Sequence, residues 1–189
     1  MKKQRDIIKQ LSDKELKYQL LLSQTIIFFI SLFLSFFMFD SMLQWLEHFD
    51  LNLKEIIFYG GISGIIIVLF DLLIMYLFPA KWYDDGGINE RIFKNREMSE
   101  ILIIVSVVSI AEEFLFRGVL QTTFGYVLAS SLFALVHIRY LTKPILFVSV
   151  LITSFYIGWI FELTGNLLVT ITAHFIVDFL LAIIIRYQK

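Results

Sequence analysis

The sequence contains no cysteine and only two prolines. Without cysteine, the chain cannot use a thiol nucleophile, a disulfide framework or cysteine ligands to a metal. It also shows no internal repeat, no low-complexity tract and no pattern typical of nucleic-acid binding. Charged residues make up 17% of the chain and nearly cancel, to a net charge of -1. These absences leave no sign of a nucleic-acid partner.

Apolar side chains are the main component of the sequence. Hydrophobic residues account for 58% of the chain, which includes twenty phenylalanines, and the mean hydropathy is +0.79. A typical soluble domain has a smaller apolar share. Several apolar runs approach or exceed the roughly 18–20 residues that a helix needs to cross a bilayer. The composition therefore predicts an all-α protein, a polytopic transmembrane helical bundle in the cell membrane with the lipid bilayer as its environment.

The apolar runs predict six spans, at about residues 25–45, 56–78, 101–120, 126–142, 145–161 and 167–185. Basic residues gather at the N-terminus, after the second and fourth runs, and at the C-terminus. The positive-inside rule then places both termini in the cytoplasm. We expect three sections: a cytoplasmic tail or surface helix over residues 1–24, two accessory spans with a basic loop over 25–100, and a four-span core over 101–189.

The third predicted span carries three charges in the stretch Ala111-Glu112-Glu113-Phe114-Leu115-Phe116-Arg117. Each ionised group near the centre of a bilayer costs roughly 2.5–3.5 kcal/mol. Glu113 and Arg117 are four residues apart, so on a helix they share a face, can pair and can brace the bundle. Glu112 points about 100° away and has no partner in its own helix. Glu112 is therefore the first candidate for chemistry.

Two later spans also contain ionisable residues. Phe133 and His137 are four residues apart in the fourth span, and His174 and Asp178 have the same spacing in the sixth. This spacing puts the imidazole and carboxylate of the sixth span on one helix face. An ionisable residue inside a membrane span is a functional-site hypothesis by default. We expect the side chains of Glu112, His137, His174 and Asp178 to meet in one polar pocket.

The chain thus has three ordered motifs: Glu112-Glu113-x-x-x-Arg117, Phe133-x-x-x-His137 and His174-x-x-x-Asp178. Together they resemble the motif set of the CPBP family, the CAAX-protease and bacteriocin-processing intramembrane proteases, also called the Abi family. The resemblance covers about residue 101 to the C-terminus. It implies an intramembrane endopeptidase that acts on a membrane-associated protein or peptide. The last family position takes Asn or Asp, so Asp178 fits, although the better-described prenyl-endopeptidase members resemble the Asn form.

The resemblance also implies roles for these side chains. Glu112 would be the general base that takes a proton from water, with His137 holding that water or the base. His174 and Asp178 would stabilise the oxyanion of the tetrahedral intermediate. Because a carboxylate cannot donate a hydrogen bond, Asp178 would orient His174 or act in its protonated form. Glu113, Arg117 and Phe133 would give structural support.

The metal requirement stays open at this point. Members of the family are commonly called metalloproteases, and Glu112, His137 and His174 could ligate Zn²⁺ with one open position. The sequence has no His-Glu-x-x-His motif, and the same residues suit a metal-free glutamate mechanism, which we favour.

Three alternatives remain. Gly61-Ile62-Ser63-Gly64 resembles the Gly-x-Ser-Gly of rhomboid serine proteases, although Gly60 and Gly64 also form a Gly-x-x-x-Gly helix-packing surface. A proton- or ion-coupled transporter would use the buried acids and histidines as a relay, joined by Asp71 of the second span. The third is a non-catalytic membrane scaffold or immunity protein. Replacing Glu112 or Ser63 distinguishes these functions.

Overall fold

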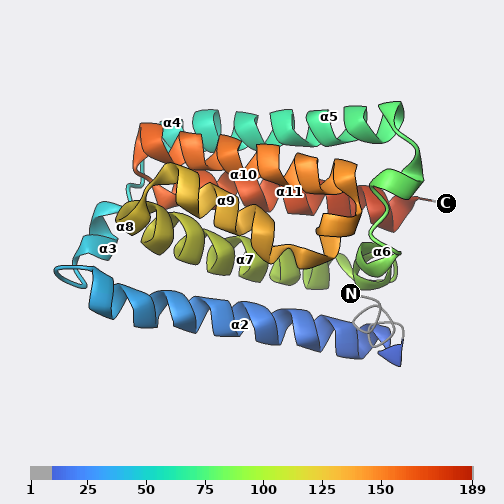
Figure 1. The fold of residues 1–189 in the computed structure, drawn as a ribbon, viewed down its shortest axis with the longest axis horizontal. Helices are drawn as coiled ribbons and strands as arrows, with labels where there is room; N and C mark the ends of the chain where they lie inside the picture. Colours follow the sequence, from blue (N-terminus) through green and yellow to red (C-terminus); the bar gives the residue numbers. More distant parts are fainter. Residues whose placement is uncertain (1–9, 189) are drawn as a thin grey trace.

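The computed structural model describes residues 10–188, and within them every regular element is a helix. The predicted all-α class is confirmed for this part of the chain. The portion of the predicted surface helix that precedes Gln10 lies outside the described residues. Figure 1 shows the long helices running side by side, with α5 along one face of the bundle, α2 along the other and the remaining long helices between them.

The described helices fall into long elements and short connectors. The long ones are α2 (Asp13–Met38), α5 (Ile62–Leu77), α7 (Met98–Glu113), α9 (Tyr126–Val136), α10 (Pro144–Thr164) and α11 (Leu167–Tyr187). Two π-helices, η1 (Ile56–Gly61) and η3 (Phe114–Gln121), precede α5 and follow α7. The short helices are α3 (Gln44–Glu47), α4 (Leu53–Glu55), η2 (Ala80–Trp82), α6 (Ile88–Phe93), α8 (Thr122–Phe124) and η4 (Ile138–Thr142).

Four helices in the described chain are long and apolar enough to cross a membrane. They are Asp13–Met38, Leu53–Leu77, Pro144–Thr164 and Leu167–Tyr187. The first starts earlier and ends earlier than predicted, and the other three lie close to the predicted second, fifth and sixth spans. The continuous helix formed by α7, η3 and α8 carries the charged residues of the predicted third span, and α9 has only 11 residues. The structure is therefore that of a helical membrane protein with four candidate spans.

Helix α2 differs from its prediction at both ends. It begins at Asp13, where Ser12 Oγ accepts from the amide of Glu15 at 3.3 Å and the Glu15 carboxylate accepts from the amide of Ser12 at 2.7 Å. This capping box starts a helix among residues that we expected to form a separate tail. The helix therefore continues across the predicted boundary near residue 24. Gln24 instead lies inside α2, which packs along α7 and η3.

The region between the third and fourth predicted spans also needs correction. The polar stretch at residues 121–125 does not interrupt the helix, which runs through η3 to Phe124 and stops at Gly125, where φ is 88°. The following helix ends at Val136 rather than near residue 142. His137 Nδ1 lies 2.8 Å from the carbonyl oxygen of Phe133, one of the carbonyls that a helix end leaves without a backbone partner. The His137 side chain thus caps α9, and η4 continues the chain.

Glycines bring α5 and η1 close to α11. A Cβ at Gly64 would lie 2.7 Å from Ile176 Cβ, and a Cβ at Gly60 would lie 2.7 Å from Val169 O. This confirms the interpretation of Gly-x-x-x-Gly as a packing surface. Ser63 is buried between them, with its hydroxyl 3.4 Å from that of Tyr156 on α10.

Candidate active site

The two adjacent glutamates lie at the end of α7, where the α-helix changes into the π-helix η3. Such π-segments are frequent at functional sites. The exposed fraction is 7% for Glu112, 0% for Glu113 and 1% for Arg117. Charges buried to this extent need partners within the protein.

Glu113 is the centre of a buried ionic network. Its Oε1 lies 3.1 Å from Nη1 of Arg117, so the predicted pair is present, and 2.8 Å from Nδ1 of His174 on α11. Because a carboxylate only accepts, Nδ1 of His174 carries the hydrogen and Nε2 points away from Glu113. Arg117 also donates to the carbonyl oxygen of Ser154 on α10 at 2.9 Å. Glu113 therefore does more than brace its own helix, because it fixes the orientation of His174.

Glu112 has partners on two other helices. Its Oε1 accepts from Nε2 of Gln24 at 2.8 Å, and its Oε2 lies 3.9 Å from Nε2 of His174. Gln24 comes from α2 and is only 4% exposed. Sequence analysis missed Gln24, and the one available signal was an amide between two apolar runs, residues 20–22 and 26–30.

Asp178 lies one helical turn after His174, with Oδ2 3.6 Å from His174 Nε2. The imidazole therefore has Glu113 at Nδ1, and both Glu112 and Asp178 near Nε2. Three carboxylates thus surround the ring, and Nε2 faces two of them, Glu112 and Asp178.

Phe133 packs between the two histidines. Its ring centroid lies 4.9 Å from that of His137 and 5.9 Å from that of His174, and the Arg117 guanidinium carbon lies 4.7 Å from it. His137 Nδ1 must donate to the Phe133 carbonyl oxygen, so Nε2 remains as the acceptor of a neutral His137 ring. One residue of each motif, Arg117, His137 and His174, thus lies near one aromatic ring.

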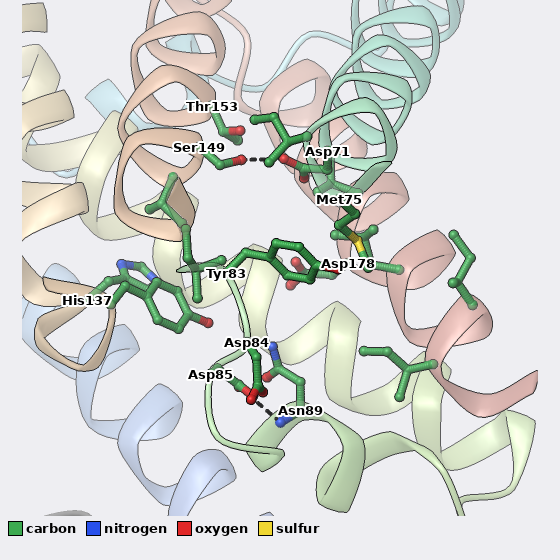
Figure 2. A pocket seen from close by; sticks show the side chains of 18 of the residues that line it. Asp71, Met75, Tyr83, Asp84, Asp85, Asn89, His137, Ser149, Thr153 and Asp178 are labelled. Atoms are coloured by element: carbon green, nitrogen blue, oxygen red, sulfur yellow. Dashed lines mark hydrogen bonds between the residues drawn. The ribbon is translucent and has the colours of Figure 1, made fainter. Parts of the chain in front are cut away.

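Two cavities meet at His137, His174 and Asp178. The first, about 360 Å³, is also lined by Gln24 and Glu112, and we refer to it as the Glu112 cavity. The second, about 350 Å³, is also lined by Asp71, Ser149 and Tyr83, and we refer to it as the Asp71 cavity. Figure 2 shows the Asp71 cavity. The side chains of Asp71 and Ser149 point toward one another in its wall, and His137 and Asp178 line other parts of the wall. The imidazole of His174 therefore faces space on two sides.

The predicted zinc ligands do not form a metal-binding group in this arrangement. Among residues 10–188, no set of three or more histidine, aspartate and glutamate side chains has a geometry that could hold a metal ion. The Nδ1 atoms of His137 and His174 are both engaged in hydrogen bonds, to Phe133 O and Glu113.

Comparison with known proteins identifies the family. A family model described as type II CAAX prenyl endopeptidase Rce1-like matches residues 94–180, the segment that holds all three motifs. The chain is also 42% identical over 167 residues to the Bacillus subtilis (strain 168) protein YpbD, and the alignment covers 88% of each chain. The chain belongs to the Rce1-like family. No solved structure matches it.

Membership of the Rce1-like family confirms the resemblance found in the three motifs and places the chain in a family of proteases. The family match begins at residue 94, so α2 and α5 lie outside it. These two helices nevertheless supply Gln24 and Asp71 to the cavities around the motifs. Part of the candidate site of this Rce1-like protein is therefore built by residues that the family model does not cover.

Proposed function

We propose that the protein is an endopeptidase of the cell membrane that hydrolyses a peptide bond of a membrane-associated protein or peptide. The observation that carries this proposal is the buried Glu112 carboxylate, with one oxygen held by Gln24 and the other beside His174 at the wall of a cavity. A carboxylate held in this way has a lone pair available for a water molecule. Membership of a protease family supports hydrolysis as the reaction.

The reaction begins with a water molecule hydrogen-bonded to Oε2 of Glu112 and to Nε2 of His137. Glu112 takes a proton from this water as the oxygen attacks the carbonyl carbon of the peptide. The new oxyanion accepts a hydrogen bond from Nε2–H of His174, whose ring is held by Glu113. Glu112 then gives its proton to the leaving nitrogen, the C–N bond breaks, and a carboxylic acid and an amine are released.

Asp178 and Gln24 affect this reaction indirectly, by positioning His174 and Glu112. Asp178 lies 3.6 Å from His174 Nε2 and places a carboxylate beside the nitrogen that donates to the oxyanion. Gln24 donates to Oε1 of Glu112 and so turns Oε2 towards the Glu112 cavity. These roles are those of the glutamate mechanism favoured from the sequence.

We also propose six crossings with both termini in the cytoplasm. The continuous helix from α7 to α8 would be the third crossing, and α9 with η4 the fourth. The start of α2 and the end of α11 lie at the same end of the bundle, near α6, which supports an even number of crossings (Figure 1). The predicted sections, a tail, two accessory spans and a catalytic core, stay a proposal, with α2 joining the first two.

Proteomics of membranes from cells carrying wild-type protein or Glu112→Gln tests this function. We expect proteins with uncut segments to accumulate only in the variant, because the amide cannot take a proton from water. Equal expression of both proteins in the membrane is the control. Identical peptide profiles at full expression would favour the non-catalytic scaffold instead.

A further inference from the structure

Asp71 is a carboxylate in the middle of an apolar helix, and it faces the Asp71 cavity. Among the described residues, its hydrogen-bond partner is the hydroxyl of Ser149 on α10 (Figure 2). A carboxylate has about four acceptor positions. One hydroxyl leaves most of them open to the cavity.

No described lysine or arginine lines this cavity. Its other acidic lining residues are Asp84, Asp85, Glu90 and Asp178. Asp84 accepts from the amides of Gly86 and Gly87, and Asp85 accepts from the first amides of α6. These two carboxylates already have partners in the fold. Asp71 has no cationic partner among the described residues. An ionised carboxylate inside a membrane protein is stabilised chiefly by such a partner.

The Asp71 cavity also reaches the proposed catalytic residues, because His174 and Asp178 form part of its wall. A peptide whose scissile bond lies beside His174 can therefore extend into this cavity. Apolar side chains such as Met75 and Val150 also line this cavity. A long side chain with an apolar stem and a charged end suits such a lining.

We propose that Asp71 binds a basic side chain, lysine or arginine, of the peptide substrate, in a subsite completed by Ser149 and Thr153. This inference rests on the proposed function and names its substrate class: a membrane-associated peptide with a basic residue near the cleaved bond. Ser149 holds one oxygen of Asp71, and the other oxygen receives the ammonium or guanidinium group.

Binding of a synthetic peptide series to purified Glu112→Gln protein in detergent tests the subsite without requiring cleavage. The series is one apolar peptide in which lysine, or norleucine of similar length, occupies each position in turn. We expect lysine at one position to bind roughly tenfold or more tightly than norleucine, as for a charge-assisted hydrogen bond. Adding Asp71→Asn should remove this preference, and adding Asp71→Lys should favour a glutamate peptide at the same position. Ser149→Ala keeps the carboxylate but removes the hydroxyl that holds one of its oxygens, so it should weaken the lysine preference without removing it.

Equal binding of the lysine and norleucine peptides to the Glu112→Gln protein overturns the subsite, as does a lysine preference that survives Asp71→Asn. Cleavage of the same series by the protein with Glu112 intact separates this inference from the proposed function. Asp71-dependent binding with no cleavage of any peptide would contradict only the proposed hydrolysis. Cleavage at a rate that does not depend on the basic residue would contradict only the proposed subsite.

Discussion

The two cavities on either side of His174 contain carboxylates in contrasting surroundings. In the Glu112 cavity, Glu112 has both oxygens near fixed protein groups, an amide and an imidazole. The cation at the wall of this cavity, Arg139, is itself paired with Asn89 and Asp85. In the Asp71 cavity, Asp71 has one hydroxyl partner, and no described cation lines the space.

This difference separates two uses of a buried acid. A carboxylate that must take a proton from one water molecule needs a fixed orientation, which Gln24 provides for Glu112. A carboxylate that must receive a ligand needs open acceptor positions, which Asp71 retains. Variants at Glu112, Glu113, Gly64 and Gln24 test whether hydrolysis takes place in the Glu112 cavity and which contacts hold the two cavities in place.

The largest expected effect is that of Glu112→Gln on cleavage. Loss of a general base lowers the rate by about 10²–10⁴-fold, and cleavage of peptides by purified protein measures it. A Glu112→Gln protein that cleaves as fast as wild-type protein would contradict general-base catalysis by Glu112.

Ser63→Ala is the matched control for this variant. Ser63 is buried like Glu112, but its hydroxyl pairs with Tyr156. We expect cleavage to be unchanged. Loss of cleavage in Ser63→Ala together with activity in Glu112→Gln would indicate a serine mechanism with Ser63 as the nucleophile.

The second effect is on stability and concerns Glu113. Replacing it by glutamine leaves Arg117, which is 1% exposed, without its carboxylate partner. Breaking a buried ion pair costs about 3–5 kcal/mol, which denaturant unfolding in micelles would measure. The control is Glu162→Gln on α10, an exposed glutamate whose partner is Gln121. We expect this control to lower the free energy of unfolding by about 1 kcal/mol or less. Equal losses for both variants would mean that the Glu113 network does not hold the two cavities together.

Much of the fold and the site could be predicted because apolar runs and charges inside them are strong signals. The bounds of α10 and α11 fall within a few residues of the predicted spans, and the Glu113–Arg117 pair follows from helical spacing alone. The meeting of Glu112, His174 and Asp178 follows from the cost of leaving such groups in lipid.

The remaining features depend on how helices pack against one another, which local spacing does not contain. Glu113 contacts His174 only because α7 and α11 have a particular relative register. The end of α9 at Val136 depends on the His137 side chain folding back onto a carbonyl group. Gln24 was placed in a tail because the charges before it suggested a surface segment, whereas Ser12 starts a helix that carries it into the bundle.

A smaller effect concerns the packing of α5 on α11, which bounds the Asp71 cavity. Gly64→Ala places a Cβ 2.7 Å from Ile176 Cβ and 2.9 Å from Ala173 O, so α5 must shift. Such overpacking costs about 1–3 kcal/mol in an unfolding measurement. Gly61→Ala is the matched control, since no atom lies within 4 Å of its added Cβ, and it should be neutral or slightly stabilising. If both variants were neutral, the contact between these helices would be looser than the cavity wall requires.

The smallest effect we expect is that of Gln24→Leu, and it tests whether α2 takes part in the chemistry. The variant removes the donor to Glu112 Oε1 while keeping an apolar side chain of similar size in a buried position. We expect cleavage to fall roughly tenfold, the equivalent of about 1.4 kcal/mol. Gln19→Leu, an exposed position earlier on α2, should leave the rate unchanged. An unchanged rate in Gln24→Leu would mean that Gln24 only packs α2 against α7, and that the two cavities differ less in how they hold their carboxylates.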